Sequence, residues 1–204
     1  MINKYSKFSI IFLVLLMQTF ATLISQASET DILKKELVLG LLPEMNIFKQ
    51  RERFELLAPF FRKHMGLEVK LTMLSYSNVI EKFKNNEIDG AFLGSFTGAL
   101  AITQLGVVPL ARPVNIDGSS SYQEYIFTRK DNNIRTFSDM KGKSLALVEE
   151  TTAGFVFPMA WLKQHGVDET STYLGEQFIS SSHDRVIAWV LNGKADFGAA
   201  KSTI

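Results

Sequence analysis

Hydroxyl side chains gather where apolar segments of this chain give way to predicted helices. Thr151 and Thr152 follow the apolar run 143–149, Ser95 follows another such run, and Tyr76 lies in a polar stretch before a third helix. A helix N-terminus carries free N–H groups and partial positive charge, so it can bind an anion without Lys or Arg. These residues therefore predict an anion site built from neutral donors. Alternatively, each hydroxyl is an ordinary N-cap that stabilises its own helix by roughly 0.5–2 kcal/mol.

Two further side chains could join such a site. His183 opens a predicted helix between a run of serines and Asp184, where its ring could donate a hydrogen bond to an anion. Tyr122 carries a hydroxyl on an apolar ring that could reach into a cleft. The alternatives are an exposed first-turn histidine and a packing tyrosine. An enzyme that uses His183 as a base is the weakest hypothesis, because no nucleophile or metal cluster accompanies it and familiar catalytic motifs are absent.

A faint internal repeat relates the two halves of the chain at a constant offset of 107 residues. Its matched pairs are Val79–Ile80 with Val186–Ile187, Asn85 with Asn192, Asp89 with Asp196, Ser95 with Ser202 and Tyr76 with His183. Gly90 against Phe197 and Gly94 against Lys201 are mismatches, and a pattern this short leaves chance as the alternative. A duplicated α/β unit predicts two similar lobes with a cleft between them, which the strand and helix ends would face.

Alternating strand and helix patterns surround these residues. Strands are predicted at 36–42, 67–74, 89–93, 107–111, 122–128, 143–149, 177–179 and 195–199, and helices at 50–65, 75–86, from 95, 152–165 and 182–192. Strand–helix alternation is typical of parallel sheets covered by helices. Residues 113–121, with the sequence PVNIDGSSS, form the clearest break and the predicted hinge.

Composition excludes several classes of protein. The chain has 204 residues, a formal net charge of +1 and no cysteine. Disulfides, thiolate catalysis and cysteine-ligated metal sites are therefore excluded. The balanced charge gives no basis for a nucleic-acid partner, which would favour a clustered basic face.

The N-terminus has the layout of a secretory signal peptide. Lys4 and Lys7 precede the apolar run 8–17, and Ser25-Gln26-Ala27 supplies small residues at a cleavage site. We therefore expect residues 1–27 to be removed and the mature protein to reside in the periplasm or at the cell exterior. An uncleaved anchor that also uses residues 20–24 is the alternative.

Several motifs together resemble the periplasmic phosphate-, phosphite- and phosphonate-binding proteins of ABC importers. The matching segments are Thr151-Thr152-Ala153-Gly154-x-x-x-Pro158, Gly118-Ser119-Ser120-Ser121-Tyr122, Tyr76 with the later Ile88-Asp89-Gly90-Ala91 and Gly94-Ser95, and His183-Asp184; Asp139-Met140-Lys141-Gly142-Lys143 is a less specific match. The resemblance runs from about residue 36 to the C-terminus.

This resemblance implies a two-lobed α/β fold of the type II periplasmic binding proteins. Lobe 1 would span 36–112, the hinge 113–121 and lobe 2 122–204. The implied ligand is a small phosphorus oxyanion, held by Tyr76, Ser95, Tyr122, Thr151, Thr152 and His183. The implied protein is a monomer without cofactor or catalysis, and its partner is an inner-membrane ABC permease. The alternative is a periplasmic sensor domain of a signalling protein with the same fold.

Three features depart from the family pattern. Ala153 replaces a hydroxyl residue, and Leu93 stands where an aromatic residue often precedes Gly-Asn. The chain also stops at Ile204, where the family fold normally returns to lobe 1 for some 80 further residues. We therefore expect either a C-terminally truncated fragment or a first lobe with an exposed sheet edge and poor stability.

Overall fold

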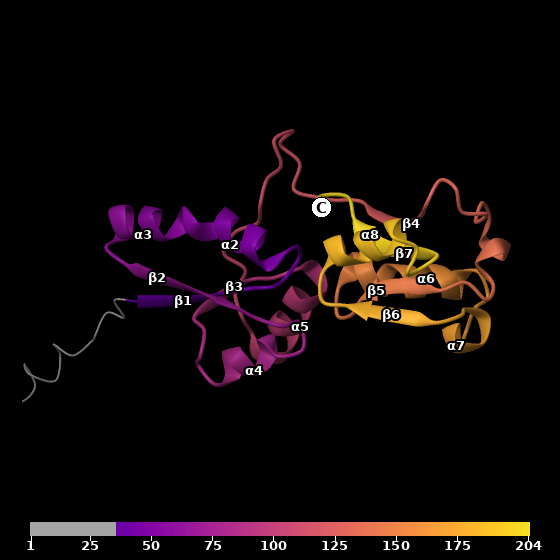
Figure 1. The fold of residues 1–204 in the computed structure, drawn as a ribbon. Helices are drawn as coiled ribbons and strands as arrows, with labels where there is room; N and C mark the ends of the chain where they lie inside the picture. Colours follow the sequence, from indigo (N-terminus) through magenta and orange to yellow (C-terminus); the bar gives the residue numbers. More distant parts are fainter. Residues whose placement is uncertain (1–35) are drawn as a thin grey trace, which may run out of the picture. The chain divides into compact units, whose positions relative to one another are not determined.

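Two sheets organise the protein in the computed structural model, which describes residues 36–204 (Figure 1). The first sheet has the strand order β2-β1-β3, and all its pairings are parallel. The second has the order β4-β7-β5-β6 and is parallel except for β4, which pairs antiparallel with β7. The strands are β1 (Glu36–Leu41), β2 (Glu68–Met73), β3 (Gly90–Phe92), β4 (Glu124–Thr128), β5 (Leu145–Val148), β6 (Gln177–Ser180) and β7 (Phe197–Lys201). The predicted α/β class with mainly parallel sheets is confirmed.

Helices cover both faces of the first sheet. Figure 1 shows α2 (Ile47–Glu55) and α3 (Leu57–Met65) on one face, and α4 (Val79–Lys84) and α5 (Ser95–Leu105) on the other. One helix was predicted over 50–65, but the chain forms two, which meet at Leu56. Gly66 ends α3 as predicted, because its φ of 65° lies in the left-handed region that glycine adopts readily. The main core of this half lies under α4, where Val79 and Ile88 pack against Leu42 and Leu74.

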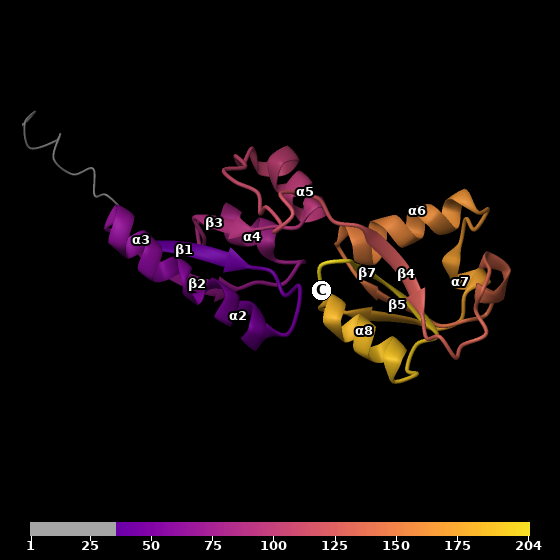
Figure 2. The ribbon, with the colours of Figure 1, turned by 90° about the horizontal axis from the view of Figure 1, so that it is seen from above.

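The second sheet is buried between α6 (Phe157–Gln164) and α8 (His183–Leu191), as Figure 2 shows. Alternate residues of β5 point to opposite faces: Leu145 and Leu147 join the core with Leu162 of α6, while Ala146 and Val148 join the core under α8. Burial on both faces explains why this strand is apolar throughout. Two elements escaped prediction: the short helix α7 (Thr170–Tyr173) and the π-helical turn 152–156 that precedes α6.

The sequence repeat is a structural repeat. Val38–Leu41 of β1 and Leu145–Val148 of β5 lie 107 positions apart, as do the adjacent strand segments 70–73 and 177–180. The matched asparagines, Asn85 and Asn192, are the C-caps of α4 and α8. The matched aspartates also have the same role. The side chain of Asp89 accepts a hydrogen bond from the N–H of Val38 in β1 at 2.8 Å. The side chain of Asp196 accepts one from the N–H of Ser144, the residue before β5, at 2.9 Å.

The predicted strand at 107–111 is wrong. The segment is irregular, and its apolar side chains Val108 and Leu110 are 74% and 92% exposed. A strand needs a neighbour for its backbone groups, and no strand within residues 36–204 pairs with this one. In the part of the chain that the structure describes, β3 is an edge strand of the first sheet.

The predicted hinge, 113–121, contains a self-supporting turn. Asn115 N–H donates to the Ser119 carbonyl at 2.7 Å, Asp117 accepts the Ser119 N–H at 2.9 Å, and Gly118 takes a φ of 81°. The segment lies between the last helix of the first sheet and β4. The predicted signal peptide, residues 1–27, lies outside the described residues. From residue 36 onward, no helix has the length and apolar character to cross a membrane.

Candidate functional site

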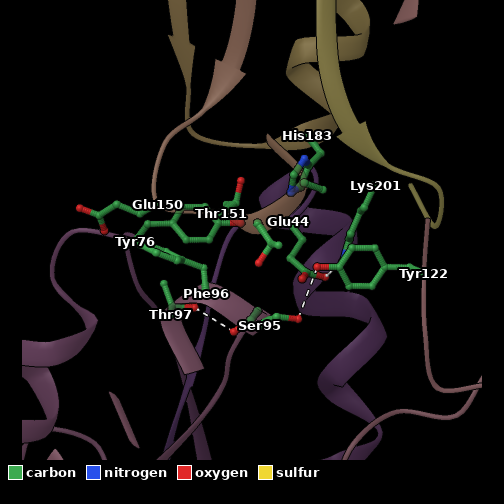
Figure 3. A pocket seen from close by; sticks show the side chains of 13 residues that line it. Glu44, Tyr76, Ser95, Phe96, Thr97, Tyr122, Glu150, Thr151, His183 and Lys201 are labelled. Atoms are coloured by element: carbon green, nitrogen blue, oxygen red, sulfur yellow. Dashed lines mark hydrogen bonds and ion pairs between the residues drawn. The ribbon is translucent and has the colours of Figure 1, made fainter. Parts of the chain in front are cut away.

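One pocket collects all six residues that were predicted to hold the ligand. Residues 36–204 form one compact unit, and this pocket holds about 320 Å³ of empty space, which includes space open to solvent. We call it the site pocket (Figure 3). Its predicted lining residues are Tyr76, Ser95, Tyr122, Thr151, Thr152 and His183, and the others are Glu44, Gly94, Phe96, Thr97, Glu150, Ala153 and Lys201. The structure thus brings the six predicted residues together, and the charged residues of the lining are ones that the sequence analysis did not single out.

The two threonines of the turn after β5 have different roles. Thr151 is the N-cap: its Oγ1 accepts the Gly154 N–H at 3.1 Å and donates to the Val148 carbonyl at 2.6 Å. Its hydroxyl is thus used within the turn, as the simple capping interpretation foresaw. Thr152 Oγ1 is buried and has no hydrogen-bond partner within residues 36–204. A buried hydroxyl without a partner costs stability, so Thr152 is the threonine whose hydroxyl is available to a ligand.

His183 is buried rather than exposed. Only 3% of the residue is accessible, and its backbone N–H donates to the Glu44 carbonyl at 3.2 Å. Burial, helped by the positive charge of Lys201, lowers the pKa of the imidazole to about 4, against the opposing effect of Glu44 and Asp184. The ring is therefore neutral at pH 7 and carries one N–H donor. Its Nδ1 has no partner among the described residues.

Tyr76 connects the cores beneath the two sheets. Its ring packs against the apolar cluster under α4 and also against the cluster under α8. Burial first, and then the charges of Glu44 and Tyr122, raise the pKa of its phenol. The hydroxyl therefore stays protonated and can donate a hydrogen bond into the pocket.

Ser95 and Tyr122, which both line the site pocket, approach each other. The Ser95 Oγ and the Tyr122 Oη lie 3.4 Å apart, at the outer limit of a hydrogen bond (Figure 3). Ser95 is the first residue of α5, so its predicted place at a helix start is confirmed, although Gly94 is the N-cap. The two side chains come from either side of the segment 113–121.

The residues that sequence reasoning missed include an ion pair that joins the two sheets. Lys201 Nζ lies 2.6 Å from Glu44 Oε2, and the two side chains are only 12% and 31% exposed. Nearby, Asn46 N–H donates to Asp184 Oδ2 at 2.7 Å. The loop after β1 is thus held against the end of β7 and the start of α8.

The repeat held a signal for these residues. Glu44 lies 107 positions before Thr151, and Lys201 lies 107 positions after Gly94, so the pocket is lined by equivalent positions of both units. The mismatch of Gly94 with Lys201 counted against the repeat, yet it marks the one lysine of the pocket lining. Equivalent positions of a duplicated unit can face one site without sharing chemistry.

The arrangement suits an anion held mainly by neutral donors. Two phenols, four aliphatic hydroxyls and an imidazole line the pocket. The charge of Lys201 is balanced by Glu44, and Glu150 is a second carboxylate of the lining. Ala153, where the resembled family has a hydroxyl, is 2% exposed and adds a methyl group to the lining. Leu93 is not part of the lining and packs on the core under α4. From residue 36 onward, no three His, Asp or Glu side chains cluster as metal ligands.

Comparison with known proteins shows the family to which this chain belongs. Residues 39–204 match the family described as "ABC transporter, phosphonate, periplasmic substrate-binding protein". The chain is 27% identical over 179 residues to the probable ABC transporter phosphite-binding protein PhnD1 of Prochlorococcus marinus, covering 83% of this chain and 59% of that protein. The chain therefore spans about three fifths of that relative's length.

Solved structures show the fold. A binding-protein component of a phosphonate ABC transporter from Pseudomonas aeruginosa superposes with a TM-score of 0.76 at 18% identity, covering 83% of this chain and 58% of that one. PhnD1 of Prochlorococcus marinus in complex with methylphosphonate superposes with a TM-score of 0.71 at 25% identity, covering 82% and 64%. An arginine-binding protein from T. maritima shares the fold at a TM-score of 0.53. The chain has the type II periplasmic binding protein fold and belongs to the phosphonate family of ABC-transporter substrate-binding proteins, a transport family rather than an enzyme family.

Proposed function

We propose that this chain captures a small phosphorus oxyanion in the periplasm for import by an ABC permease of the inner membrane. The ligand is a phosphonate, a phosphite or a phosphate ester, and it is bound in the site pocket without chemical change. The proposal draws on the family membership and on the methylphosphonate that the PhnD1 relative binds. It includes export through the signal peptide at residues 1–27 and action as a monomer.

One observation carries the proposal. Thr152 Oγ1 and His183 Nδ1 are buried polar atoms without partners, and both residues line the same pocket. Native proteins leave few such atoms unsatisfied, because each costs about 1–3 kcal/mol. An oxyanion in the pocket would accept from the Thr152 hydroxyl and from the neutral imidazole, and so remove part of this cost.

The protein would close on its ligand by bending at residues 113–121. This segment links the first sheet to β4; Ser95 precedes it in the sequence and Tyr122 directly follows it, and their hydroxyls lie 3.4 Å apart. The lobes that move would be 36–112 and 122–204. The ion pair of Glu44 with Lys201 would help to hold the closed form.

A matched pair of threonine variants tests the proposed site. Calorimetry should show binding of phosphite or methylphosphonate to the wild-type protein, and Thr152→Val should weaken it about 10-fold or more, because one hydrogen bond to a charged ligand is lost. Thr151→Val should instead lower stability, since its hydroxyl holds the turn after β5. Unchanged affinity in Thr152→Val, with the protein folded, would exclude this pocket as the oxyanion site.

A further inference from the structure

A second cavity opens beside the site pocket. We call it the side cavity; its empty space, which includes space open to solvent, is about 650 Å³ and exceeds that of the site pocket. The two cavities share four lining residues, Tyr76, Phe96, Thr97 and Glu150. In Figure 3 these four lie together on one side of the site pocket, away from Lys201 and Tyr122. A ligand whose charged group occupies the site pocket would therefore point any substituent on that side toward the side cavity.

The wall of the side cavity is mostly apolar. Val79 and Ile80 come from α4, and Phe96 and Leu100 come from one face of α5. Thr97 adds no free polar group, because its hydroxyl donates to the Gly94 carbonyl at 3.3 Å. Such a wall gains free energy when it covers apolar atoms and offers little to a strongly hydrated group.

The polar residues of the cavity restrict the charge that it can accept. Glu150 stands at the boundary between the two cavities, with Ser77 and Gln104 as the other polar lining residues. No Lys or Arg lines the side cavity. A second anionic group on the ligand would meet the Glu150 carboxylate without a cation to offset the repulsion.

We propose that the side cavity binds an uncharged alkyl or aryl substituent of the phosphorus ligand. The inference rests on the proposed function, because it needs the oxyanion in the site pocket. It narrows the ligand class to organophosphonates, or organic phosphate esters, that carry an apolar group of several carbon atoms. Ligands with a carboxylate substituent are disfavoured.

A chain-length series tests this assignment. Titration calorimetry on the wild-type protein would compare methyl-, ethyl-, propyl- and butylphosphonate, with phosphonoacetate and aminoethylphosphonate as charged comparators. Each methylene that enters the cavity should tighten binding about fourfold, so butylphosphonate should bind about 60-fold tighter than methylphosphonate. Phosphonoacetate should bind more weakly than ethylphosphonate. Affinity that falls with chain length, or an aminoethylphosphonate that outcompetes propylphosphonate, would overturn the proposal.

Variants on α5 locate the effect. Leu100→Trp should fill the cavity and remove the gain of butyl over methyl, while methylphosphonate binds within about twofold of wild type. Gln104 is more exposed than Leu100. Gln104→Leu should strengthen the binding of butylphosphonate but not that of methylphosphonate. This variant tests the assignment even if Leu100→Trp does not fold. Ile102→Trp is the matched control, because Ile102 is 45% exposed on the same helix and outside the cavity. Equal chain-length gains in wild type and in folded Leu100→Trp would contradict the assignment.

The outcomes separate this inference from the proposed function. If methylphosphonate and phosphite bind but longer chains do not bind tighter, the site pocket stands and the side-cavity assignment is wrong. If no phosphorus oxyanion binds to the folded protein, the proposed function fails, and the assignment fails with it.

Discussion

Acid should destabilise this protein through one buried imidazole. His183 is 3% exposed, and its pKa falls from 6.5 to about 4 in the folded protein because burial disfavours the charged ring. The groups that face it are Lys201 from β7, Glu44 from the loop after β1 and its helix neighbour Asp184. Between pH 6.5 and 4 the unfolded chain binds a proton at this residue and the folded protein does not.

The magnitude follows from the two pKa values. Each pH unit between 6.5 and about 4 corresponds to about 1.4 kcal/mol, so the full effect is about 3 kcal/mol. Because the folded pKa is the lower one, this stability is fully present above pH 6.5. It is lost as the pH falls through that range toward 4. For a domain with a typical stability of 5–15 kcal/mol, such a loss is a large fraction.

Guanidinium unfolding of ligand-free protein at pH 7.5, 6.5, 5.5 and 4.5 would measure the effect. The free energy of unfolding of wild type should fall by about 1.4 kcal/mol per pH unit more than that of His183→Gln below pH 6.5. His64→Gln is the control, because His64 is exposed in the last turn of α3 and outside the pocket. If wild type and His183→Gln show the same pH slope, the reasoning about this imidazole is refuted.

Two further predictions concern the pocket walls. Gly154→Ala should lower stability by about 1–3 kcal/mol in thermal unfolding, because a Cβ there would lie 2.6 Å from Thr151 Oγ1 and 2.7 Å from the Cβ of Val148. Gly94→Ala, with its nearest contact at 3.8 Å, should have little effect, and equal losses in both variants would contradict this argument. Lys201→Met should raise the pKa of His183, since it removes a charge that lowers this pKa. The acid-induced loss should therefore shrink relative to wild type, and an equal or larger loss would be inconsistent with this account.

Local pattern sufficed for the elements that are buried on one or both faces. The strand at 143–149 and the helix at 182–192 are read from apolar runs and cap residues, and both lie within one or two residues of their observed bounds. The six predicted site residues lie together along one pocket because strand and helix ends meet at one edge of parallel sheets; their role in ligand binding stays a prediction. The break at Leu56 lies just before Pro59, the third residue of α3, which has no N–H to donate to the Glu55 carbonyl. The helical spacing of the apolar residues over 50–65 hides this break, although the proline marks it.

Two features could not be predicted because each depends on a partner that lies far away in the sequence. The segment 107–111 has the composition of a strand but lacks a neighbouring strand in the described part of the chain. Glu44 matters because it forms an ion pair with Lys201, which lies 157 positions later in the sequence. No local pattern marks either residue. The roles of Thr151 and Thr152 could not be separated either, because both are hydroxyls at one junction.

The structural repeat means that one backbone arrangement, used twice, presents two sets of side chains to the same pocket. Glu44 in the first unit occupies the position equivalent to Thr151 in the second. The other equivalent pairs are Tyr76 with His183 and Gly94 with Lys201. The duplicated strands and helices fix the backbone position of each lining residue. A substitution can therefore change one side chain without displacing the residues beside it. Selectivity can therefore be adjusted one face at a time. A substitution at Lys201 alters the charge seen from the second unit, while the phenol and serine of the first unit keep their positions.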